Sequence, residues 1–180
     1  EFVHELRNKR LGLSDTVFAQ IKRFTEAMRR RQRIDFAEAQ GIARLIGRRP
    51  DAEAVFLEAG CHFARQVYLT ISPLTRRALR SLPALFTRPI ALRHVRRIAQ
   101  RYARGSVRRV GGTIMLEVGE SVTRDATPKA VGCAFYESAL RELIQLMVGG
   151  EGAVDHVRCA SRGEGSCEWR AEWRPVRGKG

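Results

Sequence analysis

The sequence predicts an α+β fold, in which a helical N-terminal part packs on a twisted antiparallel sheet of about four strands. Three observations indicate this fold. Apolar residues recur at helical spacing through the first hundred residues, a pair of short apolar runs flanks Gly111 and Gly112, and a second pair surrounds a glycine-rich turn near the C-terminus. A further helical segment lies between the two pairs. Because the order is helices, hairpin, helix, hairpin, we expect helices to cover the sheet.

Turn residues divide the first part of the chain into helices. Ser14 is a suitable N-cap for a helix over residues 15–33. A second helix follows and ends at Gly47, and Pro50 opens a third that runs to about Ile71. Prolines at positions 73, 83 and 89 then punctuate the chain.

The segment after Pro89 predicts an amphipathic helix. Its apolar face carries Ile90, His94, Val95, Ile98 and Tyr102, and its other face carries Arg93, Arg97, Arg101 and Arg104. We expect the arginine face to be solvated, since arginines are mostly exposed. The alternative is that these arginines bind a nucleic acid or an acidic protein partner.

The sheet begins after Gly105. Residues 107–110 and 113–118 predict a first hairpin, and Pro128 opens a helix that ends at the Gly149–Gly150 pair. Two last strands are predicted at residues 153–160 and 166–173. We therefore expect one domain over residues 1–174, made of a helical part, 14–104, and a sheet and metal-site part, 105–174, followed by a basic tail, 175–180.

The charge of the chain is strongly positive. The formal net charge is +14, and not one Asp or Glu occurs from Ala59 to Leu116. That stretch must carry a strong positive potential. No apolar run is long enough to cross a bilayer, and the charged N-terminus lacks the apolar stretch of a secretion signal, so we expect a cytoplasmic protein without a membrane span.

Four residues of the last third have the chemistry of a metal site: Cys133, His156, Cys159 and Cys167. Three thiolates and one imidazole suit a tetrahedral zinc ion, and a closed set of four indicates a structural ion rather than a catalytic one. His156 and Cys159 would point to opposite faces of a regular strand, so the site requires a bulge or bend between them. Buried thiols, or a disulfide between Cys159 and Cys167, are the alternatives.

The residues around these cysteines carry a family resemblance. The segments Gly132-Cys133-Ala134-Phe135-Tyr136-Glu137, Val157-Arg158-Cys159-Ala160 and Gly163 to Cys167, followed by Glu168-Trp169, resemble the 4-vinyl-reductase domain family. That family includes a bacteriochlorophyll-biosynthesis protein and the sensor domain of phenol-responsive activators, and its fold is similar to TRAPP vesicle-tethering subunits. The resemblance implies a homodimer and a zinc site of three cysteines and a glutamate, whose place His156 takes here.

These observations predict a non-enzymatic sensor or carrier domain that encloses a small hydrophobic molecule. Candidates for the pocket wall are Phe63, Phe86, His94 and Tyr102. No nucleophile motif, dinucleotide-binding loop or flavin signature occurs, so no catalytic residue is assigned. The alternatives are an enzyme or auxiliary protein of tetrapyrrole biosynthesis, and an arginine-rich protein that binds a nucleic acid or another anionic partner.

Overall fold

A computed structural model describes residues 15–30, 32, 35–126, 130–149 and 152–172. Five helices come first, then a hairpin, a sixth helix and a second hairpin, which confirms the predicted α+β class. The helices are α2 (Asp15–Arg29), α3 (Phe36–Gly47), α4 (Ala52–Leu69), α5 (Pro73–Ser81), α6 (Ala84–Ala103) and α7 (Cys133–Val148). The strands are β1 (Ser106–Val110), β2 (Thr113–Val118), β3 (Val154–Arg158) and β4 (Cys167–Glu172), with a short 3₁₀ helix, η1 (Ala160–Arg162), between the last two.

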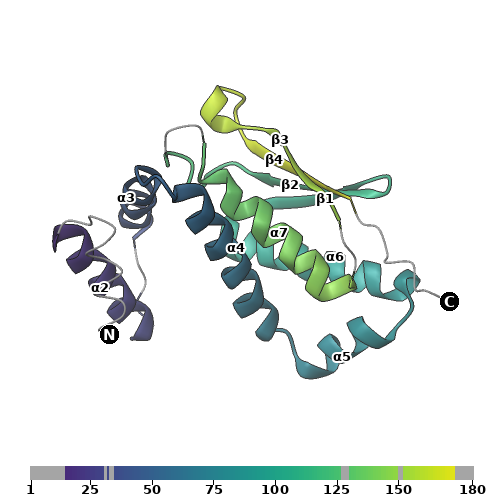
Figure 1. Cartoon of the computed structure of the whole chain (residues 1–180). Coiled ribbons are helices and arrows are strands. Elements are labelled where there is room, and N and C mark those ends of the chain that lie inside the picture. The colour runs from purple at the N-terminus through teal and green to yellow at the C-terminus, as the bar shows by residue number, and fades with distance from the viewer. Residues whose placement is uncertain (1–14, 31, 33–34, 127–129, 150–151, 173–180) are drawn as a thin grey trace.

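The four strands form one antiparallel sheet in the order β1-β2-β4-β3. Its two central strands send Ile114, Leu116, Val118, Trp169 and Ala171 into the core, at alternating positions as the pleat requires. Helices α6 and α7 cover that face (Figure 1). The opposite face is polar, and there the almost fully buried Glu168 pairs with Arg108 at 2.8 Å.

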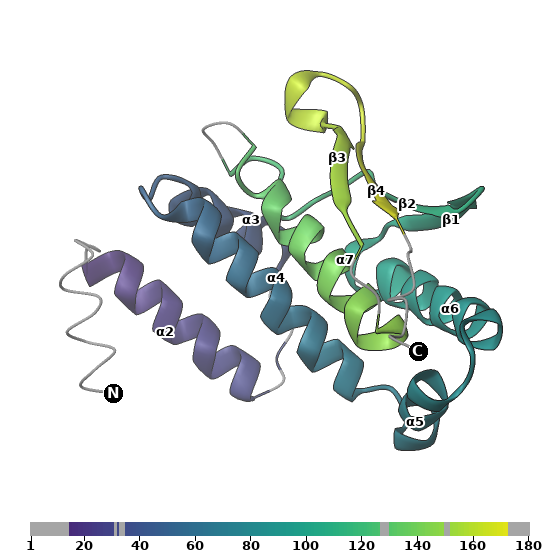
Figure 2. The same ribbon diagram turned by 45° about the vertical axis from the view of Figure 1, so that its right-hand side comes forward.

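Helix α4 packs along α7, on the side away from the sheet (Figures 1 and 2). Gly60 permits this approach, because any Cβ there would overlap the Ser138 hydroxyl and the carbonyl oxygen of Phe135. Helix α7 is therefore enclosed between α4 and the sheet, and Leu140, Ile144 and Met147 are each almost fully buried.

The helix bounds differ from the predictions at the prolines. The amphipathic helix was expected to follow Pro89, but α6 begins at Ala84 and contains that proline. Pro89 lies in the second turn, and its missing N–H leaves the carbonyl of Leu85 without a helical partner. Leu85 is highly exposed, so solvent reaches that region and the loss is tolerated. Helix α7 begins at Cys133. Its expected start at Pro128, and the expected N-cap of the first helix at Ser14, both lie outside the described residues.

Candidate ligand cavity and metal centre

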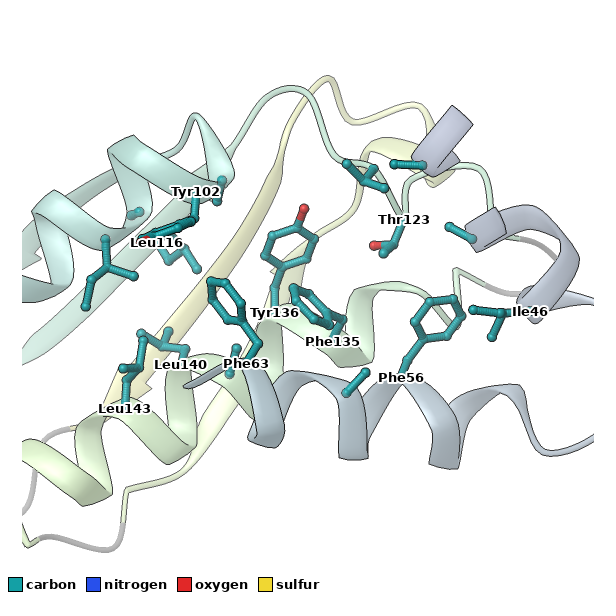
Figure 3. Close-up of a pocket in the computed structure, with 18 of the residues that line it drawn as sticks. Ile46, Phe56, Phe63, Tyr102, Leu116, Thr123, Phe135, Tyr136, Leu140 and Leu143 are labelled. Atoms are coloured by element: carbon teal, nitrogen blue, oxygen red, sulfur yellow. The ribbon is translucent and has the colours of Figure 1, made fainter. Parts of the chain in front are cut away.

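A cavity of about 430 Å³ lies between the helices and the sheet (Figure 3). Strand β2 contributes Leu116, and residues 122–123 close one side. The remaining lining comes from helices: Phe24, Ala39, Ile42, Ala43, Ile46, Val55, Phe56, Ala59, Phe63, Val95, Ile98, Ala99, Tyr102, Ala103, Phe135, Tyr136, Ala139, Leu140 and Leu143. The wall therefore combines residues far apart in the sequence.

The cavity wall is almost entirely apolar. Its only polar side chains are Thr123 and two tyrosines, Tyr102 and Tyr136. The Thr123 hydroxyl donates to the carbonyl of Gly132 at 2.7 Å, so its proton is already used. Burial raises the pKa of Tyr136, which keeps its hydroxyl neutral. Tyr102 is 47% exposed and so marks the side of the cavity that opens to solvent. The space suits an apolar molecule.

The four residues predicted to line a pocket lie in different places. Phe63 and Tyr102 both line the cavity, and their rings meet edge to face with centroids 5.6 Å apart. Phe86 is 56% exposed on the surface, and the half-buried His94 is not among the residues that line this cavity. Sequence reasoning missed most of the wall, notably the aromatic residues Phe56, Phe135 and Tyr136. Phe135 and Tyr136 belong to the apolar face of α7, and such a face has the same residue pattern in a packed core and in a cavity wall.

The predicted arginine face of α6 is exposed along its length. Arg93, Arg97, Arg101 and Arg104 all lie at the surface. The guanidinium of Arg104 lies 5.6 Å from the centre of the Phe36 ring and pairs with the exposed Glu120 at 3.4 Å. Whether this face binds a polyanion stays a prediction.

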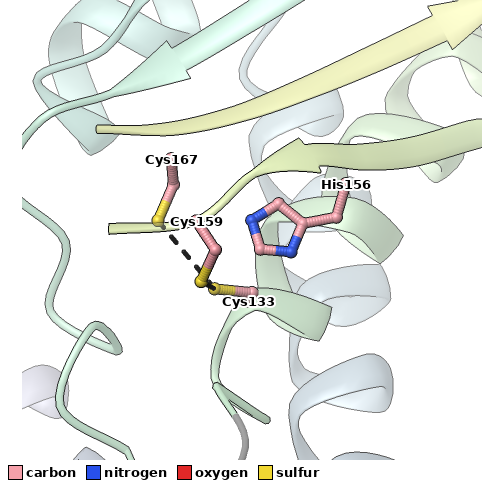
Figure 4. A group of neighbouring side chains, drawn as sticks. All are labelled: Cys133, His156, Cys159 and Cys167. Carbon is pink, nitrogen blue, oxygen red and sulfur yellow. Dashed lines mark hydrogen bonds between the residues drawn. The ribbon is translucent and has the colours of Figure 1, made fainter. Parts of the chain in front are cut away.

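Cys133, His156, Cys159 and Cys167 come together at one end of the sheet (Figure 4). Each offers one ligand atom, and these atoms all lie within 4.8 Å of one another. Cys133 is the first residue of α7, His156 lies on β3, Cys159 precedes η1, and Cys167 opens β4. The three thiols are buried, and the group could hold a metal ion.

A β-bulge brings His156 and Cys159 to the same site. His156 pairs with Trp169 and Arg158 pairs with Glu168, so Val157 is the extra residue on β3. The extra residue reverses the alternation, and the side chains of His156 and Cys159 then reach the same face. The bend that the sequence required is therefore present.

The donor geometry fits a tetrahedral ion. The Cys133 sulfur lies 4.0 Å from the sulfurs of both Cys159 and Cys167. A zinc ion with Zn–S bonds of about 2.3 Å places its sulfur ligands about 3.8 Å apart. The same distances are about twice the length of a disulfide bond, and all three thiols are free. In Figure 4 the imidazole of His156 faces the sulfurs, and its Nε2 is buried without a hydrogen-bond partner in the described part of the chain.

The cluster also favours a thiolate. A hydrogen bond from the Cys133 thiol lowers the pKa of Cys167 to about 4, and the His156 imidazole and the Ala160 N–H, which donates at 3.3 Å, act in the same direction. The same pairing with Cys167 raises the pKa of Cys133, so the two sulfurs share one proton. A cation in the cluster would replace that proton.

Aromatic rings connect the cavity to the cluster. The ring of Phe63 contacts that of Phe135, which contacts Tyr136, with centroids 5.6 and 5.2 Å apart. Tyr136 then contacts Trp169 at 5.1 Å, and Trp169 stacks on His156 at 4.9 Å. The two sites are therefore joined by continuous packing rather than separated by solvent.

Comparisons with known proteins do not assign the chain to a family. No family model matches the chain, and no curated protein matches it in sequence. One similar solved structure is trafficking protein particle complex subunit 3 from Naegleria fowleri, covalently bound to palmitic acid, with a TM-score of 0.40 and 12% identity. The match covers 88% of this chain and 93% of that one. A match at this level carries no information on ligand or function.

Proposed function

We propose that this chain is a non-enzymatic sensor or carrier domain that binds a small hydrophobic molecule in its cavity and is held together by a structural zinc ion. The observation that carries the proposal is the apolar cavity of about 430 Å³. Small-molecule sites in proteins are typically concave, mostly apolar and of this size.

The apolar wall faces water when no ligand is bound, because the cavity opens to solvent at Tyr102. A bound apolar molecule removes this surface from water, which favours binding by roughly 25 cal/mol per Å² of apolar surface buried. The same term drives the binding of apolar molecules in other concave, mostly apolar sites.

The side chains of the wall support binding rather than catalysis. Of the described residues that line the cavity, none is an acid, histidine, lysine, arginine or cysteine. A general acid or base must reach the reacting atoms, and only two tyrosines and one threonine offer a proton there. A bound molecule would be surrounded by hydrocarbon and aromatic rings.

Cys133, His156, Cys159 and Cys167 would hold the zinc ion. A closed set of three sulfurs and one nitrogen leaves no position for a substrate, so the ion supplies cross-linking and no catalysis. It would fix the β3–β4 turn to the start of α7, and Phe135 in the same first turn lines the cavity. We infer that this is the counterpart of the zinc site that the family resemblance implies.

A cavity-filling variant tests the proposal. Ala99 lies on α6, is 6% exposed and lines the cavity, so Ala99→Leu places its extra carbons in the empty space. The probe is the dye 8-anilinonaphthalene-1-sulfonate, with native mass spectrometry to detect any co-purified molecule. We expect the dye affinity to fall by roughly ten-fold while the melting temperature stays or rises.

Ala91→Leu is the matched control. Ala91 lies on the same helix and is fully buried but does not line the cavity. Overpacking there should lower the melting temperature without weakening dye binding by the folded fraction. Unchanged dye affinity in Ala99→Leu, or equal destabilisation by both substitutions, would show that the cavity is not the binding site.

A further inference from the structure

One corner of the molecule, residues 69–88, exposes large apolar side chains. It comprises the end of α4, all of α5 and the first turns of α6, and we call it the α5 corner. Figures 1 and 2 show it at the opposite end of the molecule from the β3–β4 turn. Five of the nine exposed large apolar residues in the described part of the chain belong to it: Leu69 57%, Leu74 81%, Leu82 43%, Leu85 79% and Phe86 56%.

The same corner is basic. Arg76, Arg77 and Arg80 line a surface hollow of about 310 Å³ together with Pro73 and Ser81. No carboxylate in the described residues pairs with these three arginines, and the nearest acids in the sequence are Glu58 and Glu117. Within the described part of the chain, their charge is therefore not neutralised.

The arginines are also oriented by the core. The guanidinium groups of Arg76 and Arg80 lie 5.8 and 6.0 Å from the centre of the buried Tyr68 ring. The Nε of Arg76 is buried without a hydrogen-bond partner in the described residues. The guanidinium groups that line the hollow are suited to phosphate oxygens, because arginine binds phosphates in a forked geometry.

Helix α5 presents leucine and arginine to solvent together. Leu79 is 3% exposed and anchors one face of the helix to the core. At 100° per residue, Leu74, Arg77 and Ser81 fall on the opposite face. Leu85 and Phe86 lie in the first turn of α6, which begins three residues after α5 ends, and both are exposed.

We propose that the α5 corner docks on the surface of an anionic lipid membrane. Protruding Leu and Phe side chains enter the headgroup boundary, and arginines beside them bind lipid phosphates, which is how interfacial helices attach. A nucleic acid would use the arginines but leave five large apolar side chains exposed. None of the described helices is both long and apolar enough to span a bilayer.

The test is co-sedimentation of the full chain with vesicles. The vesicles contain phosphatidylcholine alone or with about 30% phosphatidylserine, and we expect binding to the anionic vesicles only, weakened by salt. Leu74→Ser combined with Leu85→Ser should reduce binding by roughly ten-fold, since each side chain loses apolar burial. Arg77→Gln should reduce it by about five-fold.

Two control variants match these changes elsewhere. Val157→Ser removes a 43% exposed apolar side chain from β3, and Arg162→Gln removes an exposed charge from η1, within the β3–β4 turn. Both should bind anionic vesicles within about two-fold of the wild type. Binding of 8-anilinonaphthalene-1-sulfonate in the cavity should be unchanged in all four variants. A failure of the membrane proposal can therefore be distinguished from a failure of the cavity proposal.

Three results would overturn the proposal. One is equal binding to neutral and anionic vesicles. Another is loss of binding in the controls to the same extent as in the corner variants. The third is a wild-type protein that binds a DNA duplex more tightly than anionic vesicles and retains that binding in the Leu74→Ser, Leu85→Ser variant, which would assign the arginines to a nucleic acid.

Discussion

Replacing one ligand of the metal centre gives the sharpest test of the zinc assignment. Cys159 is fully buried, and in Cys159→Ser the serine hydroxyl stays protonated at neutral pH and is a poor zinc ligand. We expect zinc content to fall from about one ion per chain to near zero. Cys61→Ser is the matched control, because Cys61 is the one cysteine outside the cluster.

The effect on stability can be calculated from how the site is assembled. Cys133 is 26 residues from Cys159 and 34 from Cys167, so the unfolded chain does not hold the ligands together and zinc binds the folded state. At free zinc about one hundred times the dissociation constant, binding adds about 2.7 kcal/mol. For a chain of this length that corresponds to roughly 5–11 °C in Tm.

The assay is thermal unfolding with buffered zinc and with a chelator. The chelator should lower the Tm of the wild type and of Cys61→Ser by roughly 5–11 °C. The Tm of Cys159→Ser should stay almost unchanged, because this variant holds no zinc to lose. The reasoning is refuted if the chelator shifts all three proteins equally. It is also refuted if the purified wild type holds no metal and thiol titration finds Cys159 and Cys167 joined as a disulfide.

Two other predictions follow from packing and burial. Gly60→Ala should lose roughly 2 kcal/mol or more of unfolding free energy, because the new Cβ forces α4 and α7 apart. Gly41→Ala, in open space on α3, should instead gain up to about 1 kcal/mol, and equal effects in urea titrations would contradict the packing argument. Burial, aided by Arg97 and Arg93, lowers the pKa of His94 below its ordinary 6.5. The unfolded chain therefore takes up that proton first, so stability is present above pH 6.5 and declines as the pH falls through the lower folded pKa. His94→Gln should flatten this decline, and an identical pH profile of Tm in both proteins would exclude it.

The sequence predicted the metal cluster better than the cavity, for a physical reason. Cysteine and histidine have few roles, so three cysteines and His156 near a predicted hairpin indicated a site directly. The strand period even required the bulge that Val157 forms. Apolar residues, by contrast, look the same in a packed core and in a cavity wall. Phe135 and Tyr136 therefore gave no sign that they border empty space.

The helix starts were harder to predict than the helices themselves. Pro89 looked like a boundary because proline lacks an N–H, yet an exposed second turn absorbs that loss. The helix extends back to Ala84, so Phe86, a candidate for the pocket wall, lies in its first turn and is 56% exposed.

The row of rings from Phe63 to His156 has a thermodynamic consequence. Tyr136 borders the cavity and contacts Trp169, and Trp169 stacks on a residue of the metal cluster. A molecule whose binding shifts Tyr136, and through Trp169 shifts His156, would change the affinity of the cluster for a metal ion. By reciprocity, the ion changes the affinity for that molecule by the same factor, so metal availability would set how readily the cavity fills.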